Sequence, residues 1–175
     1  MNTEQQKIEY KSLQKIRTGE KGFKELSTTC VALANAQGGQ IMIGVEDKTK
    51  KPAPNQVISQ EEANSAVTRL RGLCFNVGLA VGDVCADETG SQYFAITVFP
   101  SLHSYATTSD GKMYIRVADK CEPVRSEDIQ RVGEEKGAFQ WELVPTLFEL
   151  EDENKTNLSK FANDIRQSDR VKQHI

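Results

Sequence analysis

The spacing of hydrophobic side chains near the start of the chain changes from a period of two to a period of three to four. In residues 7–13, apolar Ile8 and Tyr10 alternate with charged Glu9 and Lys11. Alternation of this kind is typical of a β-strand, because successive side chains point to opposite faces. These residues are therefore predicted to form a strand with one apolar side and one charged side.

A helix is predicted next, over residues 21–36. Its apolar side chains recur at steps of three and four residues, which places them on one face: Phe23, Leu26, Cys30, Leu33 and Ala34. Gly38 and Gly39 follow and are expected to end the helix. A second helix of roughly 15 residues is predicted after Ser59, because Ser59-Gln-Glu-Glu62 has the pattern of a capping box.

Several apolar segments are bounded by turn residues and predict strands. Ile41-Met-Ile43 lies within residues 40–45, which are expected to form a short strand buried on both faces. Three further strands are predicted over residues 81–89, 92–99 and 112–117, separated by Gly90, Pro100 and Asp110-Gly111. A short helix is predicted to begin at Ser126. Together these elements predict an α+β fold, a mixed and mostly antiparallel sheet with two main helices packed on it.

The chain changes character after residue 132. A helix is predicted over residues 155–166, with Leu158, Phe161 and Ile165 on its apolar face. We interpret residues 1–132 as one domain and residues 133–175 as a helical connector that leads to further domains outside this sequence.

Composition narrows the class of protein. The 175 residues are 38% hydrophobic and 27% charged, which fits one globular domain with a polar tail. No apolar run approaches the roughly 20 residues of a membrane helix, and the polar start has no signal-peptide core. A cytoplasmic protein without membrane association is expected. The four cysteines form no CxxC pair, so neither a zinc knuckle nor a thiol redox motif is supported.

Charge is distributed unevenly along the chain. The net charge is −3, yet residues 1–51 hold 9 Lys and Arg against 6 Asp and Glu, a net of +3. Any surface that attracts phosphate is therefore expected at the N-terminal end. On charge alone, an ordinary solvated surface remains the alternative.

Three motifs in this N-terminal part are similar in order and spacing to the core of the Schlafen AlbA-type domain, a family described as DNA-binding. They are Glu4-x4-Glu9-Tyr10-Lys11, Leu33-Ala-Asn-Ala-Gln-Gly-Gly39 and Ile43-Gly-Val-Glu-Asp47. The resemblance continues through Tyr114-Ile-Arg116-Val and the segment 123–129, and it covers about residues 4–132. Bacterial members are described as DNA-binding or ATP-binding regulators. No P-loop motif occurs in the sequence, so no ATP site is expected in this chain.

The resemblance also implies a catalytic possibility. Vertebrate relatives that cleave transfer RNA use two glutamates five residues apart and an aspartate after the Gly-Val strand, and these positions correspond to Glu4, Glu9 and Asp47. Three such carboxylates suit Mg²⁺ or Mn²⁺, which would activate water for phosphodiester hydrolysis. The vertebrate core pairs two similar lobes around RNA, and a homodimer could replace the missing lobe here.

Basic residues around these carboxylates are candidates for phosphate contacts. Lys7 and Lys11 share the predicted strand face of Glu9, although alternating charges also occur on any exposed strand. Further candidates are Lys48, Lys50 and Lys51 in the loop after Asp47, which could equally be solvated, and Arg116, for which a structural ion pair is the alternative. Tyr10 and Tyr114 are expected in the core rather than as stacking platforms for bases.

Three functions follow and are left open. The first is a nucleic-acid-binding module, for DNA or RNA, of a bacterial regulatory or defence protein. The second is a metal-dependent endoribonuclease that uses Glu4, Glu9 and Asp47 on structured RNA such as transfer RNA. The third is a protein-interaction platform based on the acidic C-terminal half.

Overall fold

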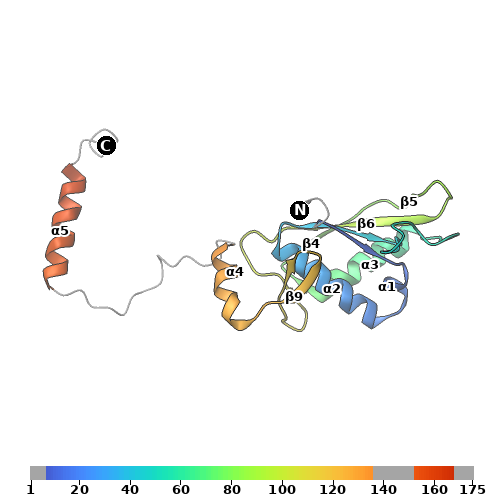
Figure 1. Cartoon of the computed structure of the whole chain (residues 1–175), viewed down its shortest axis with the longest axis horizontal. Coiled ribbons are helices and arrows are strands. Elements are labelled where there is room, and N and C mark those ends of the chain that lie inside the picture. The colour runs from blue at the N-terminus through green and yellow to red at the C-terminus, as the bar shows by residue number, and fades with distance from the viewer. Residues whose placement is uncertain (1–6, 136–151, 168–175) are drawn as a thin grey trace. The chain divides into compact units, whose positions relative to one another are not determined.

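A computed structural model of the chain describes residues 7–135 and 152–167 (Figure 1). The chain forms two compact units, residues 1–139 and 140–175. The first unit contains the sheet and most of the helices, and the second contains one helix. The expected domain boundary after residue 132 lies within a helix that ends at Glu135, and the extent of the domains stays a prediction.

The main sheet of the first unit has five strands, of which the long central one is β6 (Gln92–Phe99). On one side β2 (Gly39–Ile43) pairs with it antiparallel, and β1 (Ile8–Lys11) pairs parallel with β2 at the edge. On the other side lie β4 (Gly78–Val81) and the short β5 (Cys85–Ala86), both antiparallel to β6. This arrangement confirms the mixed, mostly antiparallel sheet predicted from the sequence.

Two main helices, α2 (Glu20–Asn35) and α3 (Gln60–Leu73), pack against one face of this sheet, as predicted. The side chains that form the core are almost completely buried: Leu26, Cys30 and Leu33 from α2, Val67 and Leu70 from α3, and Ile41, Ile43, Phe94, Ile96 and Val98 from the sheet. The alternating residues of β2 are not buried to the same degree, since Gln40 is exposed and Met42 is half-buried. The expectation that β2 is buried on both faces is therefore wrong, because both helices cover the same face.

The start of α3 and the end of α2 lie where the sequence predicted them. The Ser59 hydroxyl accepts a hydrogen bond of 3.0 Å from the Glu62 N–H and caps α3. Helix α2 ends at Asn35, and Gly38 follows with φ of +73°, a conformation that glycine adopts without steric cost.

The strand expected over residues 81–89 is wrong in its bounds. It is replaced by the end of β4 at Val81 and by the two-residue β5. Between them the side chain of Gln60 takes the place of a neighbouring strand, because its Oε1 accepts from Val84 N at 2.9 Å and its Nε2 donates to Gly82 O at 3.3 Å. A glutamine on a helix satisfies backbone groups that a ladder would otherwise pair.

A short helix, α1 (Gln14–Arg17), precedes α2 and was not predicted. Its contact with α2 depends on Gly22, where a Cβ atom would lie 2.0 Å from the carbonyl oxygen of Lys15. The glycine inside the predicted helix was therefore the one available sign of a close backbone approach.

Two small antiparallel pairs complete the first unit: β3 (Cys74–Phe75) with β7 (Thr107–Thr108), and the hairpin of β8 (Tyr114–Val117) and β9 (Lys120–Pro123). The hairpin packs on α2 and is held there by buried Asn35. The Asn35 side chain donates to the carbonyls of Ala106 and Tyr114, at 2.8 and 2.9 Å, and accepts from Ala106 N at 2.9 Å. After the hairpin come η1 (Ser126–Asp128) and α4 (Ile129–Glu135).

The second unit contains α5 (Asp152–Gln167), which includes the helix predicted over residues 155–166. Its apolar residues Leu158, Phe161 and Ile165 are exposed. The aromatic and acidic segment that precedes it lies outside the described residues. Within residues 7–135 and 152–167, no helix is both long and apolar enough to cross a membrane.

Candidate functional site

The parallel pairing of β1 with β2 brings the predicted site residues toward one edge of the sheet. Tyr10 is in register with Met42 and Lys11 with Ile43, so both strands terminate at the same end of the sheet. The chain then turns through a tight loop, which is closed by a 3.0 Å hydrogen bond from Glu46 N to Lys51 O and a bridge between Val45 and Pro52. This parallel pairing makes β1 and β2 neighbours in the sheet.

The charged side of β1 faces the helices and not the open side of the sheet. Glu9 is in register with Ile41, and Ile41 is completely buried beneath the helices. Residues in register point to the same face, so Glu9 and Lys11 lie on the helix-covered side and Tyr10 on the opposite side. Residues 7–13 do alternate as predicted, but the apolar side is the open one. This reversal is possible because β1 is an edge strand, where the polar side chains meet other polar groups.

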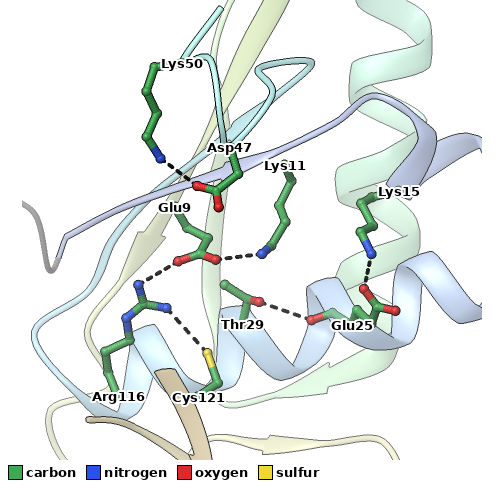
Figure 2. A network of polar contacts seen from close by, with 9 residues as sticks. All are labelled: Glu9, Lys11, Lys15, Glu25, Thr29, Asp47, Lys50, Arg116 and Cys121. Carbon is green, nitrogen blue, oxygen red and sulfur yellow. Dashed lines mark hydrogen bonds and ion pairs between the residues drawn. The ribbon is translucent and has the colours of Figure 1, made fainter. Parts of the chain in front are cut away.

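Glu9 lies at the centre of a polar network (Figure 2). Its Oε2 accepts a hydrogen bond of 2.6 Å from Nη2 of Arg116, and its Oε1 accepts one of 2.6 Å from Nζ of Lys11. Both carboxylate oxygens are thus bound to cations. The side chain of Glu9 is 18% exposed, so these contacts are shielded from water and stronger than a surface pair.

Arg116 reaches Glu9 from β8, which packs on α2. Its side chain is only 6% exposed, and its Nη1 donates to Sγ of Cys121 at 3.5 Å. Burial opposes the charged form, yet the hydrogen bonds to Glu9 and Cys121 outweigh it and raise the pKa of Arg116 above its ordinary value. The Nε atom is buried without a hydrogen-bond partner among the described residues. This burial favours the structural ion pair, one of the two roles that the sequence left open for Arg116.

Asp47 lies in the loop after β2 and has a different environment. Its side chain is 77% exposed, and its Oδ1 accepts a hydrogen bond of 2.6 Å from Nζ of Lys50 (Figure 2). This hydrogen bond, with the positive charge of Lys50 and a smaller contribution from Lys11, lowers the pKa of Asp47 below its ordinary value. Lys11 therefore forms an ion pair with Glu9 and also contributes to the lowered pKa of Asp47.

Lys50 also contacts the open side of the sheet. Its Nζ lies 4.2 Å from the centre of the Tyr10 ring, a cation–π contact. The backbone of Lys50 has φ of +55°, a left-handed conformation that is uncommon for a residue other than glycine. Tyr10 was expected in the core, but it is half-buried beneath Lys50 and is not part of the core cluster; Tyr114 does pack against the core.

The remaining predicted residues are separated from this network to different degrees. Lys48 and Lys51 are exposed in the same loop as Asp47 and Lys50, whereas Lys7 precedes β1 at the end opposite to Lys11. Glu4 lies outside the described residues, so its position relative to Glu9 stays a prediction.

The described part of the site does not present a set of free metal ligands. Within residues 7–135 and 152–167, no group of three or more His, Cys, Asp or Glu side chains lies close enough together to hold a metal ion. A carboxylate must also have a free oxygen to bind Mg²⁺ or Mn²⁺. Both oxygens of Glu9 are already bound to Arg116 and Lys11, so a metal would have to displace at least one of these cations.

The sequence did not predict a groove lined by lysines that lies beside the site. Lys15 and Lys21 line a groove of about 370 Å³ between α1 and α2, in which Lys15 forms an ion pair with Glu25. Only the existence of α1 brings these lysines together, and the sequence signal for it was the glycine at position 22.

A second missed feature lies on the open side of the sheet. A groove of about 570 Å³ is lined by Tyr10 and Met42 on one side, by Lys50 and Lys51 from the loop after β2, and by Tyr93 at the start of β6. The alternation of apolar residues in β1, β2 and β6 could have predicted that they share one face of the sheet. It could not have predicted that this face is left uncovered by the helices of the described residues.

Comparisons with known proteins agree with this fold. A family model described as Schlafen, AlbA_2 matches residues 4–125. Among solved structures, the DIP2311 protein from Corynebacterium diphtheriae is similar in fold, with a TM-score of 0.51 and 21% sequence identity over 70% of this chain. The match spans only 26% of that protein. No curated protein matches the chain.

Proposed function

This chain belongs to the Schlafen AlbA_2 family, a family that suggests a nucleic-acid-related domain, and we propose that its first unit binds the phosphate backbone of DNA or RNA. The binding surface is the end of the sheet at which β1 and β2 terminate. The exposed lysines of the loop after β2 provide the positive charge, and Lys11 lies at the same end of the sheet with its ammonium group paired to Glu9. The regulatory or defence role in a bacterial cytoplasm that the family resemblance implies is part of this proposal.

The observation that carries the proposal is the clustering of lysines by parallel strand pairing. Lys11 ends β1 at the same edge where the loop after β2 holds Lys48, Lys50 and Lys51. Lys48 and Lys51 are exposed and take part in no ion pair among the described residues. Unpaired, exposed lysines are the groups that exchange counterions with a phosphate backbone.

Binding agrees better with the geometry than cleavage does. A general acid or metal ligand needs an available carboxylate oxygen, and Glu9 has both oxygens in ion pairs at 2.6 Å. Such a half-buried, doubly paired glutamate is suited to joining the edge strand to the β8–β9 hairpin. It then supports the shape of the binding surface rather than contacting the ligand.

Metal-dependent cleavage of structured RNA is a second candidate, because one observation favours it. Glu9 pairs with Lys11 at 2.6 Å, and the positive charge of Lys11 also contributes to the lowered pKa of Asp47. With Glu4, they would form the carboxylate set of the ribonuclease members of the family, and a second copy of the chain could supply the second lobe. Mg²⁺ or Mn²⁺ would activate the attacking water if it were bound there.

Binding is tested by titrating the full chain with labelled duplex DNA and with transfer RNA at several salt concentrations. The affinity should fall steeply as salt rises. Replacing Lys48 and Lys51 together by alanine should lower the affinity and reduce the slope of log K against log salt by about 1.4–1.8. The matched control replaces Lys24 and Lys120 together by alanine, because these two lysines are also exposed and take part in no ion pair among the described residues. Absence of binding at low salt would refute the proposal.

Cleavage is tested by incubating transfer RNA with the chain and Mn²⁺. The informative variant is Asp47→Asn, since exposed Asp47 can be changed without disturbing the fold, and Glu61→Gln on α3 is an exposed acidic control. Cleavage by the wild type and by Glu61→Gln that is lost in Asp47→Asn would establish the enzyme. Binding without cleavage would support the function of a binding module instead.

A further inference from the structure

We propose that the groove on the open side of the sheet is a stacking site for one base of single-stranded nucleic acid. The groove measures about 570 Å³, within the range of about 300–1,000 Å³ that is usual for small-ligand sites. This inference rests on the proposed function and adds a second mode of recognition to it. The lysines of the loop after β2 bind phosphate, whereas the groove contacts the base.

The floor of the groove is apolar and partly aromatic. Tyr10 in β1 is in register with Met42 in β2, and Met42 with Ala95 in β6. Tyr93 lies on the same face of β6, because it is two residues from Ala95. All four side chains are only half-buried. Two aromatic rings and a methionine on one accessible surface suit a flat apolar ligand, and every nucleobase has such a face.

The Tyr10 ring is at present covered by Lys50, but this contact is weak enough to exchange. An exposed cation–π contact changes an equilibrium constant by about two- to fivefold. Stacking of a base on an aromatic side chain changes it by about five- to 150-fold. Lys50 is 52% exposed, so a base can displace it from the ring. The released ammonium group then remains beside the groove, where it can meet the phosphate of the same nucleotide.

The charges around the groove give the nucleotide one orientation. Lys50 and Lys51 line it from the loop after β2, and Asp87 and Glu88 line it from the turn between β5 and β6. Phosphate is attracted to the lysines and repelled by the carboxylates. The base should therefore extend toward the β5–β6 turn, where Glu88 can accept a hydrogen bond from an exocyclic amino group.

The wall formed by the β5–β6 turn is held in place before any ligand binds. Oδ1 of Asp87 accepts hydrogen bonds from the backbone N–H groups of Thr89 and Ser91, both at 2.9 Å, and from the Thr89 hydroxyl at 2.7 Å. These bonds lower the pKa of Asp87, with the Thr89 hydroxyl as the largest cause. A prearranged wall reduces the entropy lost on binding.

A single strand is the ligand that this geometry favours over a duplex. The bases of a duplex are stacked on each other and paired, so their faces are not available to a protein side chain without unstacking. Bases of single-stranded RNA or DNA are free to stack on tyrosine.

The test uses the full chain with a short single-stranded oligonucleotide that carries one 2-aminopurine, and with the duplex of the same sequence. Binding of the single strand should quench the 2-aminopurine emission by stacking. Tyr10→Ala and Tyr93→Ala should each weaken single-strand binding about tenfold, remove most of the quenching, and leave duplex binding unchanged. Tyr10→Phe and Tyr93→Phe keep the ring and should behave as the wild type.

Two controls separate stacking from other effects. Phe75→Ala removes an exposed aromatic ring outside the groove and should change neither affinity nor quenching. Tyr10→Ala should lower the affinity at every salt concentration without changing the salt slope, because stacking releases no counterions.

Each outcome has a distinct meaning. Unchanged single-strand affinity and quenching in both alanine variants would overturn the groove proposal, while salt-dependent binding of the wild type would still support the phosphate surface. Equal losses for duplex and single strand would also overturn it, since they would indicate a general structural defect. A wild type that binds neither ligand at low salt would refute the proposed function and this inference together.

Discussion

Glu9 and Tyr10 are neighbours in the sequence, yet they lie on opposite sides of β1 in environments that differ in almost every respect. Glu9 faces α2 and the β8–β9 hairpin, and both of its carboxylate oxygens are paired with cations. Tyr10 faces the open side of the sheet and lines a groove, and the exposed Lys50 lies above its ring. At Glu9 the strand is covered and both carboxylate oxygens are paired, whereas the opposite side at Tyr10 is accessible.

This difference teaches that charge alone does not identify a ligand-binding surface. The charged side of β1 is the side whose interactions are already satisfied within the protein. A buried ion pair satisfies its charges within the protein and joins elements of the fold. A partly covered aromatic ring still has apolar surface that a ligand can contact. The following predictions test this contrast between the two sides.

The largest expected effect is on stability, at the closed side. Glu9→Ala leaves the charge of Arg116 buried without its carboxylate partner, and removal of one member of a buried pair costs roughly 3–5 kcal/mol of unfolding free energy. Because Glu9 keeps some exposure and Lys11 can reorient, we expect about 3 kcal/mol. Urea unfolding followed by circular dichroism measures this value. Asp47→Ala, in the exposed pair with Lys50, should cost less than about 1 kcal/mol; equal losses in both variants would contradict the contrast.

A double replacement should recover part of that loss. With Glu9→Met and Arg116→Met together, no buried charge is left without a partner, because Lys11 is partly exposed and can turn to water. Apolar replacement of a buried pair is often close to neutral. We expect the double variant to be more stable than Glu9→Met alone by about 1–2 kcal/mol. A strictly additive cycle would show that Glu9 and Arg116 do not stabilise each other.

At the exposed loop, Asp47 distinguishes binding from catalysis by the sign of its effect. Asp47→Asn removes a negative charge and releases Lys50, so affinity for nucleic acid at low salt should rise about two- to fivefold, as expected for one charge near the surface. Fluorescence anisotropy with Glu61→Gln as the control measures this change. A loss of affinity would show instead that the Asp47 carboxylate contributes to the bound state, as a site for cleavage requires.

The smallest expected effect concerns a surface ion pair elsewhere on the fold. Arg17 binds Glu62 through two hydrogen bonds, of 2.8 and 3.0 Å, and the hydrogen bond from Arg17 lowers the pKa of Glu62 from its ordinary 4.5. A carboxyl whose pKa is lower in the folded protein contributes stability at pH values above 4.5 and loses this contribution as the pH falls through the folded pKa. Because the pair is exposed, the contribution should be a few tenths of a kcal/mol.

Glu62→Gln should therefore lower the unfolding temperature slightly at neutral pH and make its decline below pH 4.5 less steep. Differential scanning calorimetry from pH 7 to pH 3 measures both effects. A decline of unchanged steepness would show that Glu62 has the same pKa in the folded and unfolded protein.

Local patterns predicted a large part of the fold. The capping box at Ser59, the apolar face of α2 and the strand over residues 92–99 each show a pattern within a short stretch of sequence, and each is confirmed. The strand expected over residues 81–89 was wrong, because Gln60, more than twenty residues away, satisfies the backbone between β4 and β5. Helix α1 was missed because four residues are too few to give a periodic pattern.

For the candidate site, the sequence by itself determined which side chains alternate along β1 and that lysines follow β2, since both are properties of local order. It also placed the chain in its family through motifs that remain in order. Only the tertiary structure decided which side of β1 would be covered. That outcome depends on Asn35 holding the β8–β9 hairpin against α2, so that Arg116 meets a glutamate 107 residues away. A partner so distant in sequence leaves no periodic signal, and for this reason the closed and open sides of β1 could not be told apart before the fold was known.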